Sequence, residues 1–182
     1  MKNNRSQIIL LLILATILLL VGIYTYNLSG PDSETDESAP ASVSLVSAEG
    51  SAYTDLAGNE LDFASNIGNV IVVYAWASWS PTSVEDLNAL NSLVDEFSGD
   101  EVNFIAMNRA EPEKTAKAFL KSYEVSSQIE IVLDPDDKYY NSIGAFSMPE
   151  TVIFRKDGSI AYQKSGSINV PLVRRYIADN LD

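Results

Sequence analysis

The chain has 182 residues, of which 46% are apolar, with 25 acidic and 12 basic side chains and a formal net charge of −13. It contains no cysteine and no histidine, which excludes disulfides, thiol catalysis, conventional zinc sites and any Ser-His machinery. So acidic a chain is a poor partner for nucleic acid, and its length suits one ordinary hydrophobic core.

The N-terminal segment has the pattern of a membrane anchor. Lys2 and Arg5 precede Ile8 to Tyr26, nineteen residues without a charge. At about 1.5 Å of rise per residue, such a helix spans most of a hydrocarbon core of about 30 Å. Because basic flanks stay inside, we expect a single-pass cell-membrane protein with residues 1–7 in the cytoplasm and the rest extracytoplasmic. A cleaved signal peptide is the alternative, but it has a shorter apolar region and a small-residue cleavage site soon after it.

Residues 27–42 differ in composition from the rest of the chain. They are rich in Ser, Pro, Asp and Glu and contain hardly any apolar side chain. A segment of this kind buries too little surface to offset the entropy lost on ordering it. We therefore predict a flexible, acidic tether at 27–42, followed by a folded domain at 43–182.

The domain alternates strand patterns with helix patterns. Short β-rich runs are separated by segments whose apolar residues recur at helical spacing. The predicted strands are a hairpin at Tyr53 to Phe63, then Val70 to Ala75, Val102 to Met107, Ile129 to Leu133, and a second hairpin of Thr151 to Phe154 with Ile160 to Gln163. The predicted helices are the segment after Pro81 up to Phe97, Pro112 to Tyr123, Asp136 to Ile143, and Val170 to Asn180. This order predicts an α/β sandwich with a mixed central sheet flanked by helices.

The stretch from Ile71 to Ser83 is the centre of this pattern. A buried strand runs into a turn, and a helix is predicted to follow Pro81. Ser80 is then the N-cap before a proline at the first helical position, which stabilises a helix by about 1 kcal/mol over an alanine cap. As a nucleophile, Ser80 lacks a histidine or lysine at readable spacing to serve as its base. We expect the Ser83 hydroxyl, in the first turn, to bond the backbone or solvent.

The turn in this stretch resembles the signature of a known family. Residues 76–83 read Trp-Ala-Ser-Trp-Ser-Pro-Thr-Ser. They are similar to the Trp-Ala-Ser-Trp-Cys-Pro-x-Cys signature of membrane-anchored bacterial thioredoxin-like disulfide reductases of the TlpA/ResA type, with serine in both cysteine positions. The resemblance covers residues 43–182 and implies a thioredoxin-like fold. It does not carry over the chemistry, because disulfide exchange requires a sulfur nucleophile.

A second loop of the chain also matches the family. There, a residue followed by a cis-proline faces the motif, and its exposed backbone pairs with an extended substrate peptide. Residues 146–151 read Phe-Ser-Met-Pro-Glu-Thr and resemble that loop, which implies a cis bond before Pro149. Glu150 stands where a threonine is usual and is expected to alter which peptides are accepted. The implied binding groove is formed by Trp76, Trp79, Ser80, Pro81, Ser83, Met148 and Pro149.

Tyr74 is a further departure from the active pattern. Thioredoxins carry a buried aspartate two residues before the first Trp of the motif, and reductases of this group commonly have a polar residue there. A tyrosine removes that candidate acid and base. Together with the two serines, this favours natural loss of redox function over an engineered trap.

The acidic residues at 134–137 suggest a calcium site, but their spacing does not support one. Asp134-Pro135-Asp136-Asp137 lacks the glycine and the glutamate of a calcium-binding EF-hand loop. We therefore predict a turn with helix-capping acids and no metal site. Tyr139 and Tyr140, which follow it, are expected to be packing residues.

These observations lead to one functional expectation and two alternatives. We expect a membrane-tethered, redox-inactive module that holds an extended peptide or an extracytoplasmic protein, without a cofactor. The first alternative is a thiol-disulfide oxidoreductase, serving extracytoplasmic thiols or cytochrome maturation, whose cysteines were replaced by serine. The second is a structural component of an envelope assembly that uses another face of the domain.

Overall fold

The computed structural model describes residues 53–181. The predicted anchor at 8–26, the predicted tether at 27–42 and residues 43–52 of the predicted domain lie outside the described residues. Within 53–181, none of the helices combines the length and the apolar character that crossing a membrane requires.

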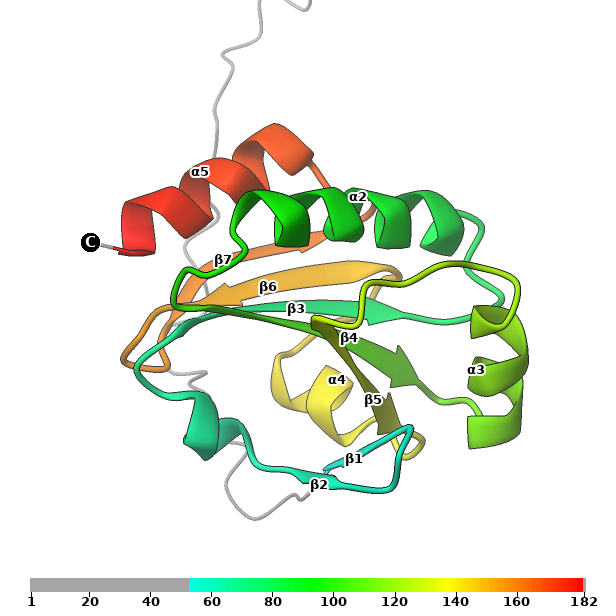
Figure 1. The fold of residues 1–182 in the computed structure, drawn as a ribbon. Helices are drawn as coiled ribbons and strands as arrows, with labels where there is room; N and C mark the ends of the chain where they lie inside the picture. Colours follow the sequence, from blue (N-terminus) through cyan, green and yellow to red (C-terminus); the bar gives the residue numbers. More distant parts are fainter. Residues whose placement is uncertain (1–52, 182) are drawn as a thin grey trace, which may run out of the picture. The chain divides into compact units, whose positions relative to one another are not determined.

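Strands and helices alternate along the described chain (Figure 1). The strands are β1 (Tyr53–Asp55), β2 (Glu60–Leu61), β3 (Val70–Trp76), β4 (Val102–Arg109), β5 (Ile129–Asp134), β6 (Glu150–Phe154) and β7 (Ile160–Ser165). The helices are a short 3-10 helix η2 (Phe63–Asn66), α2 (Ser83–Glu96), α3 (Glu113–Leu120), α4 (Lys138–Ser142) and α5 (Val170–Leu181).

The strands form one mixed sheet in the order β2-β1-β5-β4-β3-β6-β7. β3, β4 and β5 run parallel, whereas β6 lies antiparallel to β3 and β7 antiparallel to β6. The loops that follow the parallel strands therefore leave the sheet at one common edge, where α2 and α3 begin (Figure 1). This edge is where ligands approach open α/β sheets.

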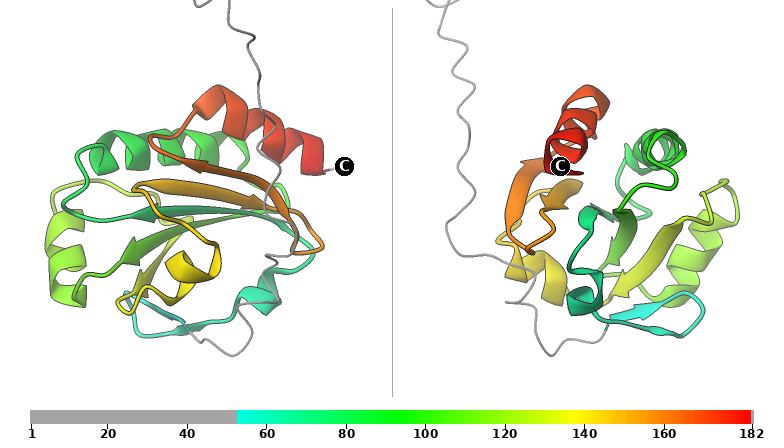
Figure 2. Two further views of the ribbon diagram at one scale, coloured as in Figure 1. Left: turned by 180° about the vertical axis from the view of Figure 1, so that it is seen from behind. Right: turned by 60° about the vertical axis from the view of Figure 1, so that its left-hand side comes forward.

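Helices cover both faces of the sheet (Figure 2). The core on one face joins the strands to α2 and α5, and α3 packs there through Ala116. The core on the opposite face contains Tyr139 of α4 and Ile143, which directly follows that helix. Successive strand residues point to opposite faces, so β3 and β4 contribute alternate side chains to the two cores.

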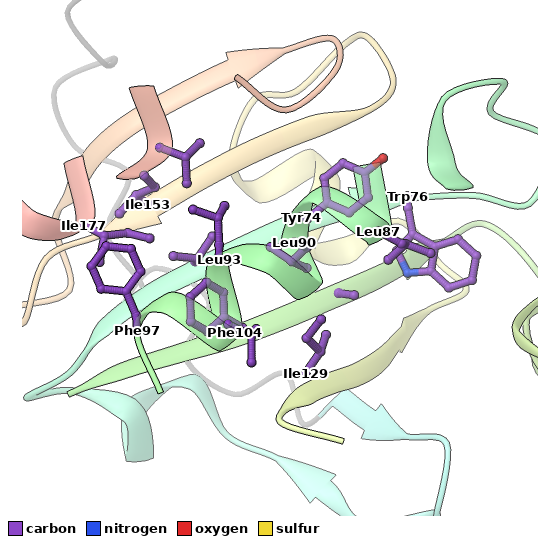
Figure 3. Packing of buried hydrophobic residues seen from close by; sticks show 14 of the residues in the cluster. Tyr74, Trp76, Leu87, Leu90, Leu93, Phe97, Phe104, Ile129, Ile153 and Ile177 are labelled. Carbon is purple, nitrogen blue, oxygen red and sulfur yellow. The ribbon is translucent and has the colours of Figure 1, made fainter. Parts of the chain in front are cut away.

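The strand β3 is buried along its whole length, as its run of apolar residues predicts. Figure 3 shows the core between this strand and α2, with Leu87, Leu90 and Leu93 on the inner side of the helix. These leucines are at most 2% exposed. Each contributes about 1.5–3 kcal/mol by leaving water.

The predicted α/β sandwich with a mixed sheet and both hairpins are confirmed. The helix boundaries differ by a few residues. The helix predicted from Asp136 begins at Lys138, because Asp137 adopts a left-handed conformation with φ of 55°. The helix predicted to reach Tyr123 ends at Leu120.

Candidate functional site

The motif at 76–83 is the turn that joins β3 to α2. Trp76, the last residue of β3, is fully buried, and its ring lies 5.2 Å from that of Phe119 in α3. Trp79 is in contrast 59% exposed at the outside of the turn. The two tryptophans therefore have different roles, since Trp76 anchors the turn to the core and Trp79 presents an apolar surface.

The prediction that Ser80 caps the helix is wrong. The helix α2 begins at Ser83 with Thr82 as its N-cap, and the Thr82 side chain makes no capping bond. The backbone forms a separate turn before the helix, with the Ser80 N–H donating to the Ala77 carbonyl at 3.0 Å and the Ser83 N–H donating to the Ser80 carbonyl at 3.3 Å. The Ser80 hydroxyl is buried and has no hydrogen-bond partner among residues 53–181.

Ser83 ties the turn to the start of the helix. Its side chain is fully buried, and its hydroxyl donates a 2.8 Å hydrogen bond to the Ala77 carbonyl. This confirms a backbone-bonding hydroxyl in the first turn. The Ser83 hydroxyl thus holds the turn in place, and neither serine has a basic group as hydrogen-bond partner that would activate it as a nucleophile.

Glu111, in the segment after β4, binds the motif through Ser78. This carboxylate is 6% exposed and accepts hydrogen bonds from the Ser78 N–H at 2.8 Å, from the Ser78 hydroxyl, and from the Asn108 side-chain amide at 2.8 Å. It follows Ala110, which is held at a φ of 51°. Sequence reasoning missed Glu111, because the contact joins residues 33 apart and no local pattern marks it.

The loop before β6 meets the motif at the edge of the sheet. Ala75 pairs with Glu150, so the next residues along each strand, Trp76 and Pro149, lie at the same edge. The bond between Met148 and Pro149 is cis, as the resemblance implies. Pro149 is buried and Met148 is half-buried.

Most of the exposed apolar side chains belong to the segments that meet at this edge, whereas Ile67 precedes the opposite end of β3. Within the described residues the large apolar side chains with high exposure are Ile67, Trp79, Tyr123 and Phe146. Phe146 is 90% exposed and lies two residues before Met148. The Tyr123 ring packs at a tilt against Phe119, which in turn packs on Trp76. Sequence reasoning included Trp79 but missed Phe146 and Tyr123, because a pattern of residue types does not report exposure.

A buried carboxylate lies beneath the motif, although Tyr74 replaces the expected acid. The Tyr74 hydroxyl donates a 2.9 Å hydrogen bond to Asp86 of α2, and the Ile168 N–H donates to the other carboxylate oxygen at 2.9 Å. Burial raises the pKa of Tyr74 far above its usual value, and the charge of Asp86 raises it further. The site therefore keeps an acidic side chain, supplied by α2 instead of β3.

Glu150 is buried against β7, which corrects the expectation that it selects peptides. Its side chain is 2% exposed and accepts hydrogen bonds from the Gln163 side-chain amide at 3.0 Å and from the Ser165 hydroxyl. These partners lie on β7, so the carboxylate fastens β6 to its neighbour.

The acidic turn at 134–137 caps a helix, as predicted. Asp134 accepts the N–H of Lys138 at 2.7 Å and of Tyr140 at 3.1 Å at the start of α4. Asp137 pairs with Arg109. In the part of the chain that the structure describes, no three acidic side chains come together in a way that suits a metal ion.

Comparisons with known proteins agree with this geometry. The Redoxin family model matches residues 34–178. The thiol-disulfide oxidoreductase ResA of Halalkalibacterium halodurans is 23% identical over 165 residues, which cover 91% of this chain and 89% of that protein. ResA of Bacillus cereus is 22% identical over 179 residues, with 97% of each chain covered.

Solved structures show the same fold. StoA from Bacillus subtilis superimposes with a TM-score of 0.60 at 19% identity, over 69% of this chain and 94% of that one. A secreted Mycobacterium tuberculosis disulfide oxidoreductase homologous to E. coli DsbE gives a TM-score of 0.62 at 18% identity, over 71% and 95%. The fold is thus thioredoxin-like. The chain belongs to the Redoxin family and is similar to its ResA-type thiol-disulfide oxidoreductases, with Ser80 and Ser83 in place of both motif cysteines.

Proposed function

We propose that this protein is a redox-inactive binding module, tethered outside the cell membrane, that holds an extended peptide or a protein partner. The binding groove is bounded by Trp79, Ser80 and the loop at Met148 and Pro149. The observation that carries the proposal is the exposure of Trp79 and Phe146 beside a motif that has no sulfur. Exposed aromatic side chains in such a position serve binding, because aromatic anchors dominate the energy of protein interfaces.

The chemistry of the motif supports the non-enzymatic half of the proposal. Disulfide exchange begins with attack by a thiolate, and the chain contains no cysteine. The Ser83 hydroxyl is committed to the Ala77 carbonyl. The Ser80 hydroxyl is buried and has no base beside it in the described fold. The Ser83 hydroxyl therefore maintains the shape of the turn, and neither serine is an activated nucleophile.

The backbone of the loop supports the binding half. Met148 lies just outside β6, and no hydrogen bond within the described fold uses its backbone N–H or carbonyl. A free donor and acceptor at the end of a strand can pair with an added extended peptide. The apolar side chains of Trp79 and Phe146 would then contact the side chains of that peptide.

The enzymatic alternative rests on the names of the relatives. Both ResA proteins are thiol-disulfide oxidoreductases, and this chain would share that activity only if its native form had cysteine at 80 and 83. Sequencing the source gene decides the matter. Serine codons at both positions support the binding module, and cysteine codons overturn it.

Site-specific photo-crosslinking in the native cells tests the binding function. A photoreactive amino acid replaces Met148 in the full chain, and a control probe replaces Lys121, which is exposed just after α3. We expect a discrete protein to be captured from Met148 and not from Lys121. Capture from Lys121 with none from Met148 would show that the partner uses another face.

A further inference from the structure

The end of β4 connects through intervening residues to both walls of the proposed groove, which are the turn at 76–83 and the loop at 145–149. Asn108 and Arg109 are consecutive, so their side chains point to opposite faces of the sheet. Asn108 binds Glu111, which in turn holds Ser78 in the wall that carries Trp79. Arg109 points to the face covered by α4. This helix leads into the loop at 145–149, which is the second wall.

Arg109 is fixed in place by two kinds of contact. Its Nε donates a 2.8 Å hydrogen bond to one carboxylate oxygen of Asp137, and a second guanidinium nitrogen donates to the other oxygen. The guanidinium carbon lies 3.6 Å from the centre of the Tyr140 ring. A planar guanidinium provides both contacts at once, which a lysine ammonium cannot do.

Tyr140 holds the loop that carries Phe146 at two points. Its backbone carbonyl accepts the N–H of Ala145 at 3.2 Å, and its hydroxyl donates a 2.6 Å hydrogen bond to the Ser147 carbonyl. Phe146 lies between these points and is 90% exposed, so packing does little to hold it. The hydroxyl bond therefore fixes the backbone immediately before Met148.

We infer that Arg109 and Tyr140 are positioning residues that set the separation between the two walls of the groove. Arg109 orients the Tyr140 ring, and the Tyr140 hydroxyl orients the Ser147 carbonyl next to the free backbone of Met148. The consequence for binding rests on the proposed function, whereas the positioning itself does not. A loop that reaches its binding-competent geometry only part of the time weakens apparent affinity by that fraction.

A distance measurement tests the positioning without a ligand. Because the chain has no cysteine, the substitutions Ser147→Cys and Glu85→Cys create two unique sites to which spin labels attach. Both residues are exposed, one in the loop and one in the first turn of α2. In the full-length chain, Tyr140→Phe removes only the hydroxyl. We expect the ratio of displaced to undisplaced loops to rise about fivefold, the factor that one ordinary hydrogen bond supplies.

Tyr139→Phe is the matched control. Tyr139 is adjacent and buried, but its hydroxyl has no hydrogen-bond partner among the described residues. This variant should give the distance distribution of the unmodified background. Arg109→Lys keeps the charge and loses the planar contacts, so it should displace the loop as Tyr140→Phe does. Equal distributions for Tyr140→Phe and Tyr139→Phe would overturn the inference.

The consequence for binding is measured separately, as the yield of the product captured from the Met148 probe. We expect Tyr140→Phe to lower this yield in proportion to the fraction of loops that stay in place, by at most about fivefold, in a domain that remains folded at the assay temperature. Displacement of the loop with full yield would overturn the role in binding. If the unaltered chain captures nothing, the proposed function fails, and the distance distributions still decide whether Arg109 and Tyr140 position the loop.

Discussion

The Tyr74 hydroxyl donates a 2.9 Å hydrogen bond to the carboxylate of Asp86, in the core beneath the motif. The same carboxylate accepts the N–H of Ile168, 82 residues further along the chain. One buried acid thus joins β3, α2 and the segment that leads into α5. A buried carboxylate requires such donors, because leaving it without partners carries a large desolvation cost.

Removal of the Tyr74 hydroxyl should destabilise the domain. In Tyr74→Phe, Asp86 keeps the Ile168 N–H and loses its other donor, so we expect the free energy of unfolding to fall by about 1–3 kcal/mol. Urea denaturation measures the loss. Tyr139→Phe is the control and should change stability little, since its hydroxyl has no partner in the described fold. Equal effects of the two substitutions would rule out a stabilising role for the bond to Asp86.

Restoring sulfur at both serine positions should restore some redox chemistry. The double variant Ser80→Cys and Ser83→Cys places two thiols around the N-terminus of α2, where the helix dipole favours a thiolate. We expect weak disulfide reductase activity, because position 80 is only 5% exposed. Reduction of a small aromatic disulfide measures it.

A matched control isolates the dithiol. Ser80→Cys combined with Ser83→Ala provides one thiol and cannot close an intramolecular disulfide, so it should show no turnover. If the folded double-cysteine variant also fails to turn over, the site lacks more than its two sulfurs.

Loss of Glu111 should loosen the motif. In Glu111→Ala, the Ser78 N–H and the Asn108 amide lose their acceptor, and we expect the free energy of unfolding to fall by about 2–3 kcal/mol. Hydrogen exchange at the Ser78 amide should accelerate. Glu113→Ala is the control, because its pair with Lys117 lies at the surface and contributes about 0.5 kcal/mol or less. Unchanged exchange at Ser78 in Glu111→Ala would contradict the anchoring role.

Glu130 should make stability depend on pH. Burial disfavours its charged form and Asp55 repels it, so its pKa lies above its usual value of 4.5. The unfolded chain then loses this proton at lower pH than the folded domain, and near neutral pH the charge opposes folding. We expect Glu130→Gln to stabilise the domain at pH 7. The gain should disappear below about pH 4, where both states are protonated.

Denaturation of Glu130→Gln and of the unaltered chain at both pH values measures this effect. Glu124→Gln removes one exposed acid and is the matched control for the change in net charge. A gain of equal size at pH 7 and below pH 4 would mean that titration of Glu130 does not cause it.

The sequence predicts the order of elements well because local patterns determine them. The buried run of β3, the helical spacing of α2 and the turn residues of the last hairpin each act within a few positions. The sequence predicts the helix start two residues too early, at Pro81 with Ser80 as the N-cap, because a serine before a proline is a good cap signal. In the fold, the backbone turn from Ala77 to Ser80 delays the helix to Ser83.

The supporting residues of the site could not be predicted from the sequence, because their contacts are not local. Glu111 meets Ser78 across 33 positions, and Asp86 meets the Ile168 N–H across 82. Such contacts depend on which strand ends meet at one edge of the sheet. The inward orientation of Glu150 could not be predicted either, because its partners lie on the next strand of the hairpin.

The yield captured from the Met148 probe, measured in two groove variants and one control variant, tests the central claim most directly. Ile67 is 45% exposed at the opposite end of β3 and is the matched control for Trp79 and Phe146. Trp79→Ala and Phe146→Ser should each lower the captured yield about tenfold, while Ile67→Ser and added reductant leave it unchanged. An undiminished yield in both groove variants, or loss of capture under reductant, would contradict a redox-inactive binding groove at the motif.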